Sequence, residues 1–278
     1  MAAEFAMRGK VLRDAPNRVV REAKNACLSF VPCNRLLYRL AKRYVDLHNG
    51  ENNADIKTNG EFHFIQQYLP RCEIVFDIGA NVGHWTSLAL KINPAARVHC
   101  FEPSRDAFEQ LQLNRFPGNV VCNNFGMSSS SRQAKMFAFD KHNTMNSLYA
   151  RKGLDNLGLS MQHEENIVLD TVDRYCLEHG IEFIDLVKMD VEGHEIEVCK
   201  GMTRMLSSGQ IGTIQFEYGG CNIDARVFLK DIFAFFTGYA YSFYKIYPKE
   251  LRLVPRYDQR LENFQYQNWA IIKNDMKS

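Results

Sequence analysis

The segment FDIGANVGHW, residues 76–85, leads from an apolar run through a glycine-rich turn into a stretch compatible with a helix. The apolar run ends at Asp77, and Gly79 and Gly83 follow before residues 84–92, which we expect to form that helix. One glycine suffices for a turn, so two at this spacing indicate that another group lies against the backbone. The helix would direct its free N–H groups and the positive end of its dipole at that group.

Strands and helices alternate along the rest of the chain. Short apolar strands without polar alternation are typical of a sheet that is covered on both faces. The predicted strands are 73–77, 97–102, 119–123, 183–190 and 211–217. The predicted helices are 84–92, 104–115, 170–179, 194–207 and 223–236. This order predicts an α/β fold with a doubly wound, mostly parallel sheet.

Two further regions add to the predicted sheet. Residues 125–168 contain serines and a strand pair, 133–139 with 165–169, and we interpret them as an insertion on the substrate side. Near the C-terminus, 239–247 and 264–272 are rich in aromatic residues. Only a polar stretch separates them, with no room for a crossover helix, so we expect these two segments to pair antiparallel.

The N-terminal residues 1–57 are predicted to be a basic helical extension of a domain formed by 58–278. Helical periodicity is present over 15–30 and 34–48. Residues 1–45 carry ten basic and three acidic side chains, although the whole chain has a net charge of only +2. Such a segment can bind an anionic membrane surface or an acidic partner, but a solvated helix face is the more ordinary interpretation.

Composition sets further expectations. No apolar run approaches the roughly 18 residues that a membrane-spanning helix needs, and no secretory signal is recognisable, so we expect a cytoplasmic protein, with peripheral membrane contact as an option. The eight cysteines form no C-x-x-C pair, which favours buried free thiols over zinc or disulfides. No nucleic acid partner is expected, and the oligomeric state stays open. Residues 48–60 are polar, and Asn59 could cap a short helix over 60–69.

An acidic residue at the end of the second predicted strand indicates the kind of ligand. Glu102 lies 23 positions after Gly79, and a carboxylate about 20 residues beyond such a loop binds a ribose diol. The spacing D-x-G-x-N-x-G lacks the third glycine that seats a pyrophosphate on the helix. A carboxylate at the rim, Asp77, would repel a pyrophosphate but attract an amino or sulfonium group. The pattern favours S-adenosylmethionine (SAM) over NAD.

Four predicted strands end in a carboxylate, namely Asp77, Glu102, Asp190 and Glu217. The carboxyl ends of parallel strands meet at one edge of a sheet, where ligands bind, so we expect these side chains to converge on one crevice. Glu192 follows Asp190 before the next helix begins. His194 is a weaker candidate for a general base, because a single histidine beside a helix start is more often structural or solvent-exposed.

With these motifs the chain resembles the FkbM-type SAM-dependent methyltransferases. The resemblance spans roughly residues 58–220 and rests on NGE (59–61), VFDIGANVGHWT (75–86), FEPS (101–104), NSL (146–148), LDTVD (169–173), IDLVKMDVEGHE (184–195) and FEYG (216–219). It implies a class I methyltransferase (Rossmann-like) fold, with a seven-stranded sheet whose last strand is antiparallel. It also implies O-methylation, with the methyl group transferred to a hydroxyl of a sugar, glycan or natural-product acceptor.

The resemblance also implies cofactor-binding residues by position. Asp77, Gly79, Asn81 and Gly83 would surround the methionine part of SAM. Glu102 would bind the ribose. The region around Asn124 would border the adenine, with Asn123 and Phe125 as alternatives.

The expected chemistry assigns roles to the remaining carboxylates. Methyl transfer from a sulfonium mainly requires alignment of the acceptor oxygen and exclusion of water. A hydroxyl acceptor also loses a proton, so a base near the methyl group assists. Asp190 is the leading candidate for this base, with Glu192 or Glu217 as a helper. These carboxylates could instead hold Mg²⁺, which would lower the pKa of the hydroxyl, although no spacing requires a metal.

Two alternatives come from other functional classes. An NAD-dependent oxidoreductase or epimerase would need a Tyr-x-x-x-Lys-like pair or a comparable site, and none follows the fourth predicted strand. Tyr241 and Lys245 have that spacing but lie on a predicted strand near the C-terminus. A non-catalytic SAM-binding adaptor would be indicated by loss of the carboxylates, and all of them are present.

Overall fold

The computed structural model describes residues 34–139, 146–152 and 161–276. Contacts between Cα atoms divide the chain into two compact units, one ending at Asn49 and one beginning at Gly50. The predicted boundary between residues 57 and 58 stays a prediction. In the first unit, α2 (Arg35–Asn49) confirms the helix predicted over 34–48, whereas the helix predicted over 15–30 lies outside the described residues.

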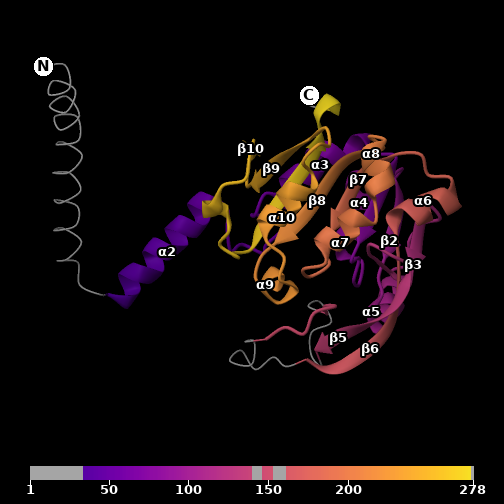
Figure 1. The fold of residues 1–278 in the computed structure, drawn as a ribbon, viewed down its shortest axis with the longest axis horizontal. Helices are drawn as coiled ribbons and strands as arrows, with labels where there is room; N and C mark the ends of the chain where they lie inside the picture. Colours follow the sequence, from indigo (N-terminus) through magenta and orange to yellow (C-terminus); the bar gives the residue numbers. More distant parts are fainter. Residues whose placement is uncertain (1–33, 140–145, 153–160, 277–278) are drawn as a thin grey trace, which may run out of the picture. The chain divides into compact units, whose positions relative to one another are not determined.

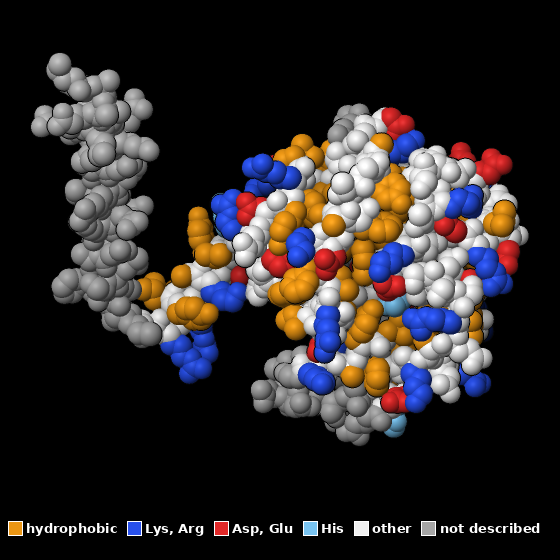
Figure 2. Space-filling view, viewed as in Figure 1, with side chains coloured by type: hydrophobic (Ala, Val, Ile, Leu, Met, Phe, Trp, Pro, Cys, Tyr) orange, Lys and Arg blue, Asp and Glu red, His pale blue; other side chains and the backbone are white. Residues whose placement is uncertain are grey.

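Helix α2 has an apolar stripe and basic side chains but buries none of its own residues. Its large apolar side chains are at least half exposed, among them Leu36, Leu40 and Tyr44. Figure 2 shows orange apolar side chains of this helix beside blue basic ones. No helix in the described parts of the chain combines the length and the apolar character that crossing a membrane requires.

A mostly parallel sheet forms the centre of the second unit (Figure 1). Its strand order is β10-β9-β11-β8-β7-β1-β2-β3. The parallel strands are β1 (Ile74–Ile78), β2 (Arg97–Phe101), β3 (Val120–Asn123), β7 (Ile184–Met189) and β8 (Ile211–Tyr218). They confirm the five predicted strands and the doubly wound fold. Because β1 lies between β2 and β7, the strand order reverses at the carboxyl end of β1, where such folds bind ligands.

The C-terminal strands complete the sheet. β11 (Gln267–Lys273) pairs antiparallel with both β8 and β9 (Tyr241–Tyr247), which confirms the pairing predicted for these aromatic segments. β10 (Glu250–Val254) adds an eighth strand where we expected only a polar connection. It pairs antiparallel with β9 across a short turn, and its alternating residues suit an edge strand.

Helices cover both faces of the sheet (Figure 1). One buried core joins β1, β7 and β8 to α6 (Val172–His179), α7 (Glu195–Lys200), α8 (Thr203–Ser207) and α10 (Leu229–Phe235). The other joins the opposite face to α3 (Glu61–Tyr68), α4 (His84–Ile92) and α5 (Arg105–Leu113). Strand β1 serves both cores, since Phe76 and Ile78 face the first core and Val75 faces the second. The shorter helices are α9 (Cys221–Ala225), η1 (Leu69–Arg71), η4 (Gln259–Leu261) and η5 (Asn274–Met276).

Two predicted helices are divided in the structure. The helix predicted over 194–207 forms α7 and α8, which are separated at Gly201. A Cβ at Gly201 would lie 2.0 Å from the carbonyl oxygen of Ser128, so the chain needs glycine where these two backbones meet. The helix predicted over 223–236 forms α9 and α10, and Arg226 between them has left-handed backbone angles.

The region 125–168 contains a second, three-stranded sheet. β5 (Arg132–Phe139) pairs antiparallel with β6 (Met161–Asp170), which confirms the predicted strand pair. The two-residue strand β4 (Gly126–Met127) pairs parallel with the end of β6. Asn59 accepts a hydrogen bond from the Glu61 N–H at the start of α3, but the N-cap residue of this helix is Gly60, so Asn59 does not occupy the predicted cap position. The cysteines within the described residues are free thiols, and Cys27 and Cys33 lie outside those residues.

We expect Gly201→Ala to destabilise the domain, because the added Cβ would collide with the Ser128 carbonyl group. Such overpacking typically lowers the free energy of unfolding by about 1–3 kcal/mol. Gly118→Ala is the matched control, since nothing lies within 4 Å of a Cβ at that exposed position. Urea unfolding followed by circular dichroism compares the two variants. Equal stabilities would mean that the backbone around Gly201 relaxes without cost.

Candidate active site

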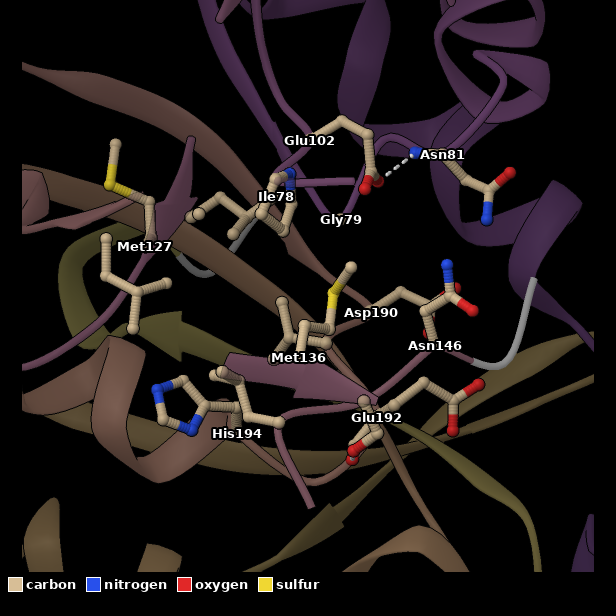
Figure 3. Close-up of a pocket in the computed structure, with 16 residues that line it drawn as sticks. Ile78, Gly79, Asn81, Glu102, Met127, Met136, Asn146, Asp190, Glu192 and His194 are labelled. Carbon is tan, nitrogen blue, oxygen red and sulfur yellow. Dashed lines mark hydrogen bonds between the residues drawn. The ribbon is translucent and has the colours of Figure 1, made fainter. Parts of the chain in front are cut away.

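Two cavities adjoin at the carboxyl ends of β1 and β7. The first cavity is lined by Glu102, Met127, Leu148, Glu192 and His194, among others (Figure 3). The second cavity is lined by Glu61, Trp85, Lys188 and Glu217, among others. Gly79, Asn81 and Asp190 line both. The point where the strand order reverses is thus shared by the two cavities.

The backbones of two loops touch at this shared point. A Cβ at Gly79 would lie 1.9 Å from the carbonyl oxygen of Asp190. Gly79 has a positive φ of 80°, which glycine adopts without strain. The Asp190 N–H also donates a hydrogen bond to the Ile78 carbonyl oxygen. The group that lies against this glycine is therefore the β7–α7 loop, in addition to whatever the cavities bind.

Gly83 serves packing rather than the cavities. It caps α4 with a positive φ of 86°, and a Cβ there would meet Leu111, Asn114 and Phe116 at 2.7–3.0 Å. It does not line either of the two cavities. Its predicted place around the methionine part of SAM gains no support from this geometry, because α5 and the residues after it occupy the space beside it.

Asp77 lies beneath the glycine loop rather than at the rim where we expected it. Its side chain is fully buried and accepts a 2.6 Å hydrogen bond from the Thr86 hydroxyl. Its second oxygen faces the Lys188 ammonium at 3.7 Å. Burial raises the pKa of Asp77, although Lys188 and Thr86 oppose that shift. Asp77 lines neither cavity, so it acts on this site through Lys188 and α4.

Glu102 points into the first cavity, as predicted, and fixes the glycine loop. One carboxylate oxygen accepts the Asn81 N–H at 2.8 Å, which Figure 3 marks, and the other accepts the Ser104 N–H at 2.8 Å. Burial raises the pKa of Glu102 to about 7, against the effect of these two hydrogen bonds. Each oxygen retains a lone pair, so the carboxylate can also accept hydroxyl groups from a ligand.

Asn124 supports the cavity from behind. Its side-chain amide donates to the carbonyl oxygens of Glu102 and Pro103, and it is not among the residues that line the first cavity. The lining there comes from Gly126, Met127, Met136 and Leu148 of the insertion and from Leu169, which follows it. Sequence reasoning missed this apolar wall, although the NSL motif at 146–148 was the available signal.

Lys188 is a buried charge at this site that was not among the predicted residues, although a lysine inside an apolar strand was the signal. Across four strands Cys100, Asp77, Lys188 and Gln215 are direct neighbours. The ammonium of this buried lysine lies 3.3 Å from Asp190 and 3.7 Å from Asp77. Burial alone would lower the pKa of Lys188, but the carboxylates of Asp190, Asp77, Glu217 and Glu61 outweigh it and raise that pKa above its usual range.

The carboxylates that surround Lys188 differ in their exposure. Asp190 is partly accessible, with 35% of its side chain exposed. Glu217 accepts a 2.9 Å hydrogen bond from the Tyr266 hydroxyl, and buried Glu61 accepts one of 2.8 Å from Gln215. Burial and the nearby Asp190 charge raise the pKa of Glu217, and burial raises the pKa of Glu61. The predicted convergence of Asp190 and Glu217 is present in the second cavity, whereas Glu102 reaches only the first.

Glu192 and His194 both line the first cavity. Glu192 has left-handed backbone angles and pairs with Arg151 at 3.1 Å, and burial and the Asp190 charge raise its pKa to about 8. Buried His194 lies within hydrogen-bonding distance of Ser128 at one ring nitrogen and of Tyr149 at the other. Burial lowers the pKa of His194 to about 4. These contacts agree with the structural role that we expected for this histidine.

Two other proposals from the sequence find no site here. Tyr241 donates to the Ile211 carbonyl oxygen and Lys245 pairs with buried Glu51 at 3.0 Å, so the Tyr-x-x-x-Lys spacing on β9 serves structure.

Within residues 34–139, 146–152 and 161–276, no group of three or more His, Cys, Asp or Glu side chains is arranged to hold a metal ion.

Comparison with known proteins finds methyltransferases among the similar chains. The chain is 30% identical over 167 residues to the hexuronic acid methyltransferase AglP of Haloferax volcanii. That alignment covers 58% of this chain and 64% of AglP. It is 29% identical over 143 residues to the 2-O-methyltransferase NoeI of Sinorhizobium fredii. That alignment covers 46% of this chain and 56% of NoeI. The chain thus spans less than two thirds of the length of these curated relatives. The crystal structure of a methyltransferase FkbM from Methylobacillus flagellatus superposes with a TM-score of 0.45 and 16% identity, over 72% of this chain and 43% of that one.

A family model gives the assignment directly. The model described as the methyltransferase FkbM domain matches residues 77–243, which include the glycine loop, Glu102, Lys188, Asp190 and Glu217. The resemblance stated from the motifs is therefore confirmed. Because the match covers more than half of the chain, the chain belongs to the methyltransferase FkbM domain family.

Proposed function

We propose that this chain is a SAM-dependent O-methyltransferase that acts on a hydroxyl of a sugar, glycan or natural-product acceptor. The observation that carries the proposal is the junction of two cavities at Gly79, Asn81 and Asp190. A transferase must hold its donor and acceptor separately and let them meet at one point. The relatives named a hexuronic acid methyltransferase and a 2-O-methyltransferase support oxygen as the acceptor atom.

In this proposal the first cavity holds SAM. Glu102 would accept the ribose hydroxyls, and Met127, Leu148 and Leu169 would contact the adenine. Its lining includes the carboxylates of Glu102, Asp190 and Glu192 but no lysine or arginine among the described residues. Carboxylates favour the positive groups of SAM and oppose the pyrophosphate of NAD. This charge pattern favours the methyltransferase over the NAD-dependent alternative.

The second cavity would hold the acceptor, with Asp190 as the general base. SAM supplies a methyl group on a positively charged sulfur, which needs no further activation. Asp190 would accept the proton of the acceptor hydroxyl, because it lines both cavities and is partly exposed. Glu217 would assist from the acceptor side, whereas Glu192 lies on the cofactor side. We give Mg²⁺ no step, since the Lys188 ammonium already lies 3.3 Å from Asp190 and 3.7 Å from Asp77.

Residues 1–45 would bring the protein to an anionic membrane surface. Arg35, Arg39 and Arg43 recur at four-residue steps along α2, beside exposed apolar side chains. A helix of this kind lies in the interface, with its apolar stripe toward the acyl chains and its basic residues on the headgroups.

Glu102→Gln should raise the dissociation constant of S-adenosylhomocysteine by roughly one to two orders of magnitude, since each charge-assisted hydrogen bond contributes about 1.5–3 kcal/mol. Because the pKa of Glu102 is raised to about 7, the wild-type affinity should also fall as the pH drops through 7 and the carboxylate is protonated. The affinity of the variant should not change over that range. Calorimetry measures both, with exposed Glu109→Gln on α5 as the control. Tighter binding of NAD than of S-adenosylhomocysteine would refute the cofactor assignment.

Asp190→Asn should leave the affinity for S-adenosylhomocysteine nearly unchanged while turnover falls by about two orders of magnitude, the usual effect of a lost general base. Turnover is measured with methyl-labelled SAM on an acceptor found by screening a glycan panel, and exposed Asp106→Asn is the control. If the variant loses cofactor affinity as severely as Glu102→Gln does, Asp190 is a cofactor ligand. If it keeps full turnover, Glu217 or Glu192 becomes the candidate base.

The full-length variant with Arg35→Glu, Arg39→Glu and Arg43→Glu should sediment less with anionic phospholipid vesicles than the wild type does. Binding of the wild type should weaken as salt approaches 1 M, where the Debye length is about 3 Å. Neutral phosphatidylcholine vesicles serve as the control. Equal sedimentation of the two proteins with anionic vesicles would assign these residues a purely structural role.

A further inference from the structure

The second cavity carries more acidic than basic groups. Glu61, Asp190 and Glu217 line it, whereas its basic side chains are Lys188 and exposed His84. The ammonium of Lys188 also lies 3.7 Å from a carboxylate oxygen of Asp77, which does not line the cavity. Burial and mutual repulsion already raise the pKa values of Glu61 and Glu217. A ligand that brings another carboxylate into this cavity would add to that repulsion.

The same cavity offers unused hydrogen-bonding groups. Glu61 accepts a hydrogen bond from Gln215 and Glu217 accepts one from Tyr266, and the carboxylate oxygens have lone pairs that can accept further hydrogen bonds. Trp85 is 6% exposed, and its indole N–H has no acceptor among the described residues. The wall therefore presents several acceptors and one buried donor. Hydroxyl groups satisfy such a set, because each can donate to a carboxylate and accept from an N–H group.

We infer that the second cavity selects an uncharged polyhydroxyl acceptor, such as a neutral hexose unit, and excludes the matching uronic acid. This inference rests on the proposed O-methyltransferase function and further specifies that the acceptor molecule is uncharged. Glu61 and Glu217 are the residues that set the selectivity for an uncharged sugar. The indole N–H of Trp85 donates a hydrogen bond to an oxygen of that sugar. Glu61 lies before residue 77, where the family match begins, so the match does not include it.

The test uses the full chain and matched pairs of methyl hexopyranosides and methyl hexuronosides. Calorimetry with S-adenosylhomocysteine comes first and establishes that the cofactor site is functional. Saturation-transfer NMR on the chain loaded with S-adenosylhomocysteine then measures sugar binding, and labelled SAM measures kcat/KM for each pair. We expect the neutral member to bind more tightly in every pair that binds, and its kcat/KM to exceed that of the uronic acid by roughly tenfold or more.

Variants then assign the selectivity to residues. Glu61→Gln should raise KM for the neutral sugar several-fold and reduce the discrimination against the uronic acid, because one negative charge is removed. Exposed Glu182→Gln is the matched control and should leave both unchanged. Trp85→Phe keeps most of the bulk and removes only the N–H donor, so it should raise KM without altering the discrimination. If Glu61→Gln does not fold, Trp85→Phe still tests whether the second cavity binds the sugar.

The outcomes separate this inference from the proposed function. Equal or better use of the uronic acids would overturn the inference and leave methyl transfer intact. Binding of S-adenosylhomocysteine with no binding of either sugar in any pair would also overturn it. Failure to bind S-adenosylhomocysteine would instead refute the proposed function itself.

Discussion

The Lys188 ammonium is the charge that the polar part of the sheet depends on. It lies in the middle of a parallel sheet, 3.7 Å from Asp77 and 3.3 Å from Asp190. Loss of one partner from a buried ion pair typically costs about 3–5 kcal/mol, because the other charge stays buried without compensation. Asp77 would be such a charge, since its side chain is fully buried. A single lysine therefore determines how much negative charge these strand ends can hold.

The backbone contact between Gly79 and Asp190 connects this charge cluster to the first cavity. The Asp190 N–H bonds to Ile78, and the Asp190 carbonyl oxygen occupies the space where a side chain at position 79 would lie. Asn81 continues the same loop and donates its N–H to Glu102. The group that would bind the ribose and the group that would act as the base are thus held at a fixed separation by backbone, which is more rigid than side-chain contacts.

The sequence predicted the elements of the sheet better than the depth of individual side chains. The five parallel strands are short apolar runs that end at polar residues, so their positions could be predicted. Strand β1 continues to Ile78, one residue past its predicted end, and this places Asp77 inside the sheet instead of at its rim. β10 was missed because an edge strand with mixed residues resembles a polar loop. The apolar wall was missed because Met136 and Leu148 reach the cavity through tertiary packing, and the NSL motif at 146–148 marks only part of it.

Burial separates the enclosed carboxylates Asp77 and Glu102 from partly exposed Asp190, which we propose as the base. A general base must reach the proton that it removes. Asp77 is enclosed and serves Lys188 and Thr86, and Glu102 is enclosed and holds two backbone N–H groups. Both ring nitrogens of His194 are engaged by hydroxyl groups. The side chain of Asp190 is 35% exposed and lines both cavities, whereas Glu192 lines only the first and Glu217 only the second. The Lys188 ammonium lies 3.3 Å from the Asp190 carboxylate and leaves part of that side chain accessible, as a proton acceptor at the junction of the cavities requires.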